Sequence, residues 1–263
     1  GLLQSFPGPA GLVEFKNVSF KYPGAQEYLL QDINFTAKPG QTTAFIGSTG
    51  SGKSTLINLI PRFYDATEGQ ILVDGADVRT VKTKSLRGKI GYIPQKALLF
   101  SGLISSNIKF GEVADVNITD EDMEDAAAIA QAAEFIEDKP DKYNEPIAQA
   151  GANVSGGQKQ RLSIARAIAK IGKRPGIFIF DDSFSALDYK TDAALRRAIA
   201  AKLGGSTVLV VAQRIGTIKN ADQIIVLDQG RIVGIGKHAE LLTGCEVYRQ
   251  IALSQLSEAE LAL

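Results

Sequence analysis

One nine-residue stretch constrains the fold of this chain of 263 residues more than any other part of it. GSTGSGKST, residues 47–55, fits the pattern G-x-x-x-x-G-K-[S/T]. The apolar run TTAFIG (42–47) before it predicts a strand, and KSTLINLIPRF (53–63) after it predicts a helix. Glycines let the backbone N–H groups of such a turn surround phosphate oxygens, and the helix N-terminus adds partial positive charge. The stretch therefore predicts a phosphate-binding loop.

The residue types in this loop suit a nucleoside triphosphate. Lys53 can reach the β and γ phosphates, and Ser54 can ligate magnesium. The other residues expected to hold the nucleotide are Gly47, Ser48, Thr49, Gly50, Ser51, Gly52 and Thr55. The alternative is a Gly/Ser connection that binds nothing, which the flanking strand and helix disfavour.

A second apolar run ends in acidic residues. IFIF (177–180) predicts a buried strand, and Asp181 and Asp182 follow it directly. In enzymes with a phosphate loop, an aspartate at the end of such a strand holds the magnesium ion. We therefore predict that Asp181 is a metal ligand. The alternative is an acidic residue that only caps the next turn.

Composition excludes several other classes of protein. Lys+Arg and Asp+Glu both number 29, so the net charge gives no bulk attraction for nucleic acid. Cys245 is the only cysteine, which excludes an internal disulfide and fits a reducing compartment. With one histidine, His238, a zinc site of the usual ligands is disfavoured. No apolar run approaches the roughly 18–20 residues of a membrane helix.

The order of elements predicts an α/β fold. LVEFKNVSF (12–20) and YLLQDINFTA (28–37) predict strands joined by a turn, hence an N-terminal antiparallel β subdomain. Strands and helices alternate after residue 177, which indicates a mainly parallel, doubly wound sheet around the phosphate loop. A helical block, about 103–171, interrupts this alternation and predicts an inserted α-helical subdomain. Within it, Thr119 is the expected N-cap of a helix.

A third motif resembles a known family. NVSGGQKQRLSIARAI (153–168) is similar to the signature motif of ATP-binding cassette (ABC) ATPases, usually L-S-G-G-Q, with Val154 at the first position. In this family the motif faces the γ-phosphate of ATP held by another subunit. The resemblance implies that role for Ser155, Gly156, Gly157 and Gln158. The alternative is a plain helix N-cap at Ser155.

The resemblance extends from about residue 12 to residue 253. It implies that Tyr22 stacks on adenine, that Gln95 contacts magnesium and water, and that Asp188 reaches across a dimer of cassettes. The sequence segment LFSG (99–102), followed by NI, is typical of exporter cassettes. GKHAELL matches a C-terminal family segment, where the histidine is expected at the surface and not in catalysis.

Two positions depart from the family pattern. The family has glutamate after the magnesium aspartate and histidine in the switch region, where this chain has Asp182 and Gln213. Aspartate is shorter by one C–C bond, about 1.5 Å, and a catalytic base must lie within about 2.6–3.2 Å of its proton or one water away. Glutamine cannot become a cation. Either change alone is compatible with neutral drift. Together they predict a degenerate site, with catalytic roles for Asp182, Gln213 and Gln95, that binds Mg-ATP and hydrolyses it slowly.

We therefore expect a cassette that powers export by ATP-dependent dimerisation with a second ABC half-transporter, at the cytoplasmic face of the cell membrane. The expected parts are a linker from a missing transmembrane domain (1–11), the cassette (12–254) and a tail (255–263). An initial Gly in place of Met fits a piece of a longer protein, or a cloning scar. Gln149, where exporters often have glutamate, concerns coupling to the membrane domain.

Three alternatives remain open. The first is a homodimeric exporter with two weak sites. The second is a soluble ABC ATPase acting on DNA, although the chain lacks the sustained heptads of the coiled-coil insertions in such proteins. The third is the separate ATPase subunit of an importer, which the exporter-like wording after Gln95 disfavours.

Overall fold

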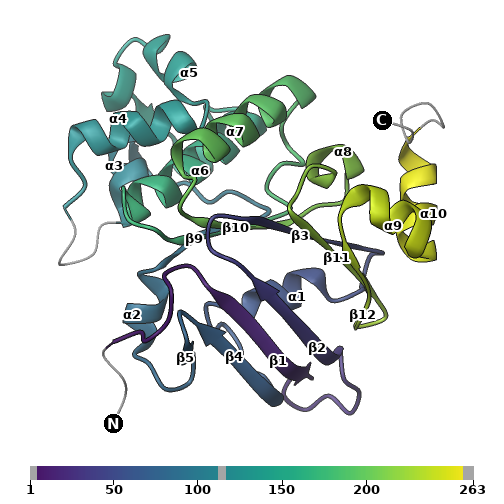
Figure 1. Ribbon diagram of the computed structural model, residues 1–263. Coiled ribbons are helices and arrows are strands. Elements are labelled where there is room, and N and C mark those ends of the chain that lie inside the picture. The colour runs from purple at the N-terminus through teal and green to yellow at the C-terminus, as the bar shows by residue number, and fades with distance from the viewer. Residues whose placement is uncertain (1–4, 112–116, 257–263) are drawn as a thin grey trace. The chain divides into compact units, whose positions relative to one another are not determined.

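The computed structural model describes residues 5–111 and 117–256 (Figure 1). The chain forms two compact units. The first unit combines residues 1–87 with residues 205–263, and the second unit comprises residues 88–204. Each unit contains both strands and helices, so the predicted α/β class is confirmed.

The first unit begins with an antiparallel sheet in the order β2-β1-β4-β5, drawn in purple and blue in Figure 1. Its strands are β1 (Val13–Phe20), β2 (Leu30–Ala37), β4 (Glu68–Val73) and β5 (Ala76–Asp77). Phe15 on β1 pairs with Phe35 on β2, and their rings stack with centroids 4.6 Å apart. The predicted N-terminal antiparallel sheet is therefore present.

The other strands of the first unit lie in the order β12-β11-β3-β10. Their bounds are β3 (Thr42–Gly47), β10 (Thr207–Val211), β11 (Gln223–Asp228) and β12 (Arg231–Gly236). β3 pairs in parallel with both β10 and β11, and only β12 is antiparallel to its neighbour. β10 is buried at every position, which fits a parallel strand that is covered on both faces.

In the part of the first unit that the structure describes, there are five helices. They are α1 (Lys53–Asn58), α2 (Thr83–Arg87), α8 (Ile215–Ile218), α9 (His238–Gly244) and α10 (Glu246–Gln255). α1 directly follows β3 in the chain, and α10 packs against β3, β11 and α9 (Figure 1).

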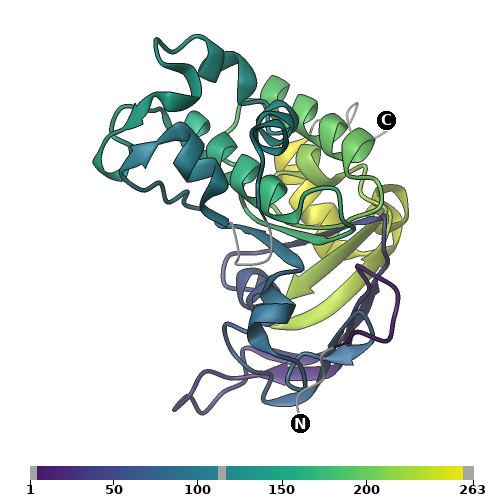
Figure 2. The same ribbon diagram turned by 90° about the vertical axis from the view of Figure 1, so that its left-hand side faces the viewer.

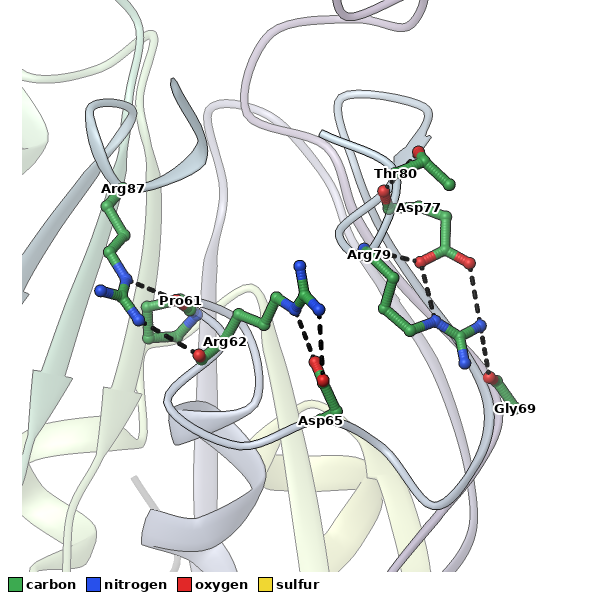
Figure 3. Close-up of polar contacts among 8 residues, drawn as sticks. All are labelled: Pro61, Arg62, Asp65, Gly69, Asp77, Arg79, Thr80 and Arg87. Atoms are coloured by element: carbon green, nitrogen blue, oxygen red, sulfur yellow. Dashed lines mark hydrogen bonds and ion pairs between the residues drawn. The ribbon is translucent and has the colours of Figure 1, made fainter. Parts of the chain in front are cut away.

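α1 is shorter than the sequence predicted, because it ends at Asn58 and not at residue 63. Pro61 and Arg62 form a turn in which Arg62 has a φ of 63°, a left-handed conformation that a helix does not contain. Figure 3 shows how this turn is held: Arg87 donates to the carbonyl oxygens of Pro61 and Arg62 at 3.0 and 3.2 Å. Arg62 itself forms an ion pair with Asp65 at 2.6 Å.

In its described residues, the second unit contains one parallel strand pair, five α-helices and three 3-10 turns. β6 (Ile90–Ile93) pairs with β9 (Ile177–Asp181), and β7 (Gly102–Leu103) pairs with β8 (Pro146–Ile147) in a short antiparallel ladder. The helices are α3 (Ile104–Ile108), α4 (Asp120–Ile129), α5 (Ala133–Glu137), α6 (Gly156–Ile171) and α7 (Tyr189–Lys202). The 3-10 turns are η1 (Lys109–Gly111), η2 (Lys142–Asn144) and η3 (Gln149–Gly151).

The helices of the second unit pack on one another. α6 contacts α3, α4 and β6, and α4 also contacts α7. Figure 2 shows the teal and green helices of this unit side by side, as Figure 1 does. The block from about 103 to 171, predicted as helical, contains α3, α4, α5 and α6 in its described residues, together with the short strand β8. Residues 112–116 of this block lie outside the described residues.

The predicted N-cap in this region is confirmed. Thr119 precedes α4, and its hydroxyl accepts a hydrogen bond from the backbone N–H of Asp122 at 3.1 Å. In turn, Asp122 Oδ2 accepts a hydrogen bond from the backbone N–H of Thr119, which completes a capping box. Residues 1–4 of the predicted linker and residues 257–263 of the predicted tail lie outside the described residues. None of the helices in the described ranges combines the length and apolar character needed to cross a bilayer.

Candidate functional site

The predicted phosphate loop joins β3 to α1 in the first unit. Gly52 is the N-cap of α1 and has a φ of 99°, which side chains other than glycine rarely adopt. At Gly47 an added Cβ would collide with the carbonyl oxygen of Leu227 on the neighbouring strand β11. The two glycines that define the motif are thus required by backbone conformation and by close packing. The loop places the start of α1 at the C-terminal edge of β3, where a phosphate can approach N–H groups.

The lysine of the loop lies inside it. Lys53 is buried, and its ammonium donates to the carbonyl oxygens of Gly47 and Ser48 at 2.7 and 3.2 Å. Ser51 Oγ is buried and has no hydrogen-bond partner among the described residues. A buried hydroxyl without a partner is costly. This loop therefore has both a positive charge and a polar atom that suit a phosphate ligand.

Tyr22 follows β1, and its ring is fixed by two other aromatic side chains. The ring lies edge-on to Phe20, with centroids 4.9 Å apart, and edge-on to Tyr64, with centroids 5.2 Å apart. Its hydroxyl lies 3.0 Å from Thr55 Oγ1, which links the ring to the first turn of α1. Tyr22 remains 39% exposed. It is therefore a held but accessible aromatic surface on which a base can stack.

Gln213 lies in the loop between β10 and α8, and its side chain is exposed. A glutamine at the end of α10 holds this loop from the other side. Gln255 Nε2 donates to the carbonyl oxygen of Gln213 at 2.7 Å, and Gln255 Oε1 accepts from the N–H of Ile215 at 2.8 Å. Sequence patterns could not predict this contact, because Gln255 lies 42 residues from Gln213 and belongs to no motif.

The two aspartates of the second unit lie at the end of β9. Asp181 and Asp182 are both buried, with exposed fractions of 8% and 9%. Tyr92 of β6 donates its hydroxyl to Asp181 Oδ2 at 3.1 Å, and Gln95 donates its Nε2 to Asp182 Oδ2, also at 3.1 Å. Burial, and then the charge of Asp181, raise the pKa of Tyr92 well above its usual value, so this hydroxyl keeps its proton.

Further side chains connect the end of β6 to its surroundings. Ser183 is fully buried, and its hydroxyl donates to the carbonyl oxygen of Ile93 at 2.7 Å. Gln160 of α6 donates to the carbonyl oxygen of Pro94 at 3.1 Å. The sequence analysis missed Tyr92, Ser183 and Gln160, because each contact is with a residue more than 60 positions away.

The signature motif begins α6. Ser155 is the N-cap, and it forms a capping box with Gln158, with both hydrogen bonds at 3.1 Å. The plain N-cap considered as an alternative is thus present, and it leaves the N-terminus of the helix exposed at Gly156. Asp188 likewise caps α7 through the N–H of Thr191 at 2.7 Å, and this hydrogen bond lowers the pKa of Asp188.

Comparison with known proteins identifies the family to which this chain belongs. The profile described as "ABC transporter" matches residues 30–185, from β2 through the end of the aspartate strand. The chain belongs to the ABC transporter family. It is 48% identical over 248 residues to the uncharacterized ABC transporter ATP-binding protein Rv1273c of Mycobacterium tuberculosis, an alignment that covers 94% of this chain and 42% of the relative.

A second relative is named as a flippase, and a similar solved structure is named as an exporter. The ATP-dependent lipid A-core flippase of Pseudomonas aeruginosa is 41% identical over 249 residues, which cover 95% of this chain and 40% of the flippase. The structure of a bacterial Atm1-family ABC exporter with ATP bound superimposes with a TM-score of 0.88 at 34% identity, over 98% of this chain and 45% of the exporter. The chain therefore spans about two fifths of the length of these curated relatives.

The family assignment makes this chain an ABC-type ATPase domain that binds ATP. Among the residues that the structure describes, no group of three or more His, Cys, Asp or Glu could hold a metal ion. The predicted ligands Ser54, Gln95 and Asp181 all offer oxygen atoms, the donors that magnesium prefers, and magnesium usually completes its shell with phosphate oxygens and water. Ser54 lies in the first unit, and Asp181 and Gln95 lie in the second. Their joint coordination of one magnesium ion remains a prediction.

His238, expected at the surface, begins α9 and is partly exposed, and its Nδ1 lies 2.6 Å from the hydroxyl of the fully buried Tyr248. Burial, and then the charge of Lys219, lower the pKa of His238. The histidine thus contributes to the packing of α9 against α10.

Proposed function

We propose that this ABC cassette binds Mg-ATP in its own site and hydrolyses it slowly, as the degenerate half of a heterodimeric exporter. The observation that carries the proposal is the joint replacement of glutamate by Asp182 and of histidine by Gln213. The residues proposed to bind the nucleotide are those of the phosphate loop, Gly47 to Thr55, with Tyr22 for adenine. Ser54, Gln95 and Asp181 are the proposed magnesium contacts.

The position of Asp182 supports a weak general base. Its carboxylate is buried and already accepts a hydrogen bond from Gln95. Its side chain is about 1.5 Å shorter than that of glutamate. A displacement of about 1 Å in a catalytic group can cost around a hundredfold in rate, which corresponds to about 2.7 kcal/mol of activation free energy.

Gln213 supports the same conclusion from the first unit. Its backbone is held by Gln255, while its side chain is exposed. A glutamine side chain there can donate a hydrogen bond to a phosphate, but it supplies no positive charge as charge develops in the transition state.

The signature motif supports an unequal pair of sites. Ser155, Gly156, Gly157 and Gln158 retain the family residues, and an added Cβ at Gly156 would meet no atom within 4 Å. In a dimer of cassettes these residues would complete the partner's site, together with Asp188. This chain would then hold one long-lived ATP molecule and help a different chain to hydrolyse the other.

The remainder of the transporter is also part of the proposal. The relatives are more than twice as long as this chain, and we propose that the cassette, residues 12–254, acts beside a transmembrane domain reached through residues 1–11. Residues from about 103 to 171 would form its helical subdomain and residues 255–263 a tail. The proposed location is the cytoplasmic face of the cell membrane, with export as the direction and no role for nucleic acid.

The test is the ATPase activity of the reconstituted transporter that contains this chain, with trapped nucleotide assigned to each site. Ser155→Arg should abolish most turnover, because it blocks the partner's nucleotide. Asp182→Ala should leave most turnover intact. The double change Asp182→Glu with Gln213→His should raise hydrolysis in this chain's site by more than the two single changes combined, because both groups act on the same water and phosphate. If Asp182→Ala removes turnover as completely as Ser155→Arg does, the proposal that this chain's own site is degenerate is wrong.

Sedimentation of the isolated cassette with saturating Mg-ATP separates the heterodimer from the homodimer. The heterodimer hypothesis predicts that the isolated cassette sediments as a monomer, because its natural partner is a different chain. A tight homodimer that forms only with ATP would favour a homodimeric exporter with two weak sites.

A further inference from the structure

We propose that Tyr92 is the positioning residue for Asp181 and that its hydroxyl sets how much magnesium the site needs to bind ATP. This inference rests on the proposed function, since it takes Asp181 as the magnesium ligand. It adds a residue to which the sequence analysis assigned no role. Tyr92 acts on the metal through the carboxylate that it holds, and we assign it no direct contact with nucleotide.

The first argument is the geometry of the two strands. β6 and β9 run in parallel, and Tyr92 is aligned with Ile179, two residues before Asp181. From this position the phenol reaches forward along β9, and its hydroxyl lies 3.1 Å from Asp181 Oδ2. A phenol at neutral pH carries its proton, so it donates this hydrogen bond to the carboxylate.

The second argument is that the contact is well supported. Asp181 is 8% exposed, and water competes little for such a carboxylate. Ser183 ties the next part of the chain to Ile93, the neighbour of Tyr92, at 2.7 Å. The strand pair and this serine fix both ends of the contact between Tyr92 and Asp181. A tyrosine also has only two side-chain torsions before its rigid ring, so little freedom is left for the hydroxyl.

The third argument is the division between the two adjacent carboxylates. Asp181 receives the hydroxyl of Tyr92, and Asp182 receives the amide of Gln95, from residues three positions apart in the chain. Each carboxylate therefore has its own donor at the end of β6. The hydroxyl limits rotation of the Asp181 carboxylate about its Cβ–Cγ bond. It can keep the oxygen that faces the metal in one orientation.

A hydrogen bond to a metal-binding carboxylate has a measurable consequence. Loss of such an outer partner usually weakens metal binding by about 10- to 100-fold. Tyr92→Phe removes only the hydroxyl and keeps the ring. We expect the magnesium concentration that half-saturates the gain in ATP affinity to rise by about tenfold or more, while ATP affinity in the absence of metal stays the same.

The experiment is ATP binding to this chain by calorimetry, first with EDTA and then at a series of magnesium concentrations. Tyr248→Phe is the matched control, because it also removes one hydroxyl from a buried tyrosine, one that contacts His238 and not an aspartate. Asp181→Asn is the comparison for loss of the metal ligand. Binding of ATP in EDTA shows that each variant is folded.

The outcomes distinguish this inference from the proposed function. A shifted magnesium requirement in Tyr92→Phe and Asp181→Asn, but not in Tyr248→Phe, supports the positioning role. So does the absence of any further shift when Tyr92→Phe is added to Asp181→Asn. If Asp181→Asn shifts the requirement and Tyr92→Phe does not, the inference is wrong and the metal role of Asp181 stands. If Asp181→Asn has no effect, the proposed metal site is wrong and the role of Tyr92 is lost with it.

Discussion

The phosphate loop of the first unit (residues 47–55) is built differently from the carboxylate edge of the second unit, which we define as Asp181 and Asp182 at the end of β9. In the loop, nearly every functional feature comes from one contiguous segment: the conformation of Gly52, the contacts of Lys53 with Gly47 and Ser48, and the start of α1. At the carboxylate edge, the aspartates are adjacent in the chain but their donors, Tyr92 and Gln95, lie 89 and 87 residues away.

This difference teaches where sequence departures can be tolerated. A loop of this kind binds phosphate mainly with backbone N–H groups, and this chain has the residues that the motif specifies. The carboxylate edge depends on side chains from two strands, and there a substitution such as Asp182 can be accommodated by a neighbour such as Gln95. We therefore expect changes in the phosphate loop to act mainly on nucleotide affinity, and changes at the carboxylate edge to act on catalysis, on stability and on the magnesium requirement.

The largest expected effect is that of Lys53→Ala on ATP affinity. Removing the buried ammonium should weaken ATP binding by at least about 2 kcal/mol, roughly thirtyfold, because the phosphates lose a fixed cation. Calorimetry measures the change. Lys38→Ala, which removes the same charge from an exposed turn after β2, should leave affinity unchanged. Equal effects of the two variants would mean that the loop does not bind the phosphates.

Tyr22→Ala comes next, and it tests the base-binding part of the same unit. Loss of the ring should weaken ATP binding by about 1–3 kcal/mol, if stacking on adenine resembles stacking on other bases. Inorganic triphosphate should bind as well to the variant as to the parent. Tyr22→Phe keeps the ring and removes only the contact with Thr55, so it is the matched control and should have little effect. A parallel loss for triphosphate would contradict a role in base recognition.

Ser183→Ala tests the carboxylate edge without touching either aspartate. The buried carbonyl of Ile93 loses its donor, and we expect the free energy of unfolding to fall by about 1–2 kcal/mol. Urea denaturation measures this. Ser185→Ala is the control, since Ser185 is exposed and donates to the carbonyl of Asp182 at 2.9 Å. Ser185→Ala should lower the free energy of unfolding by less than Ser183→Ala does. A larger loss for Ser185→Ala would mean that the carboxylate edge does not depend on the contact of Ser183 with β6.

The smallest expected effect concerns the backbone of Asp182. Its φ is 52°, a left-handed conformation that aspartate adopts more readily than most residues because its short side chain can hydrogen-bond locally. Asp182→Glu should therefore lower the free energy of unfolding slightly, by less than about 1 kcal/mol. Asp125→Glu, in helix α4, should not destabilise the protein. A stabilised Asp182→Glu variant would show that this conformation does not favour aspartate.

Much of the fold could be predicted from contiguous patterns. The strand before the phosphate loop, the N-cap at Thr119, the long helix after the signature motif and the buried strand before Asp181 all follow from local spacing and were found where expected. The end of α1 was predicted too late. Three apolar residues after Asn58, namely Leu59, Ile60 and Phe63, continue a helical pattern, but Pro61 has no N–H for a helix and forms with Arg62 the turn that Arg87 holds.

The sequence by itself determined the chemistry of the phosphate loop and the presence of paired aspartates. A phosphate loop is made from neighbouring residues, so its pattern is visible in the chain, and the family resemblance follows from the same contiguous motifs. Only the tertiary structure decided which distant side chains contact the loop at Gln213 and the carboxylate of Asp181. Gln255 meets the switch loop, and Tyr92 meets Asp181. Such contacts depend on the pairing and packing of segments far apart in the chain, and local spacing cannot encode which distant side chain arrives.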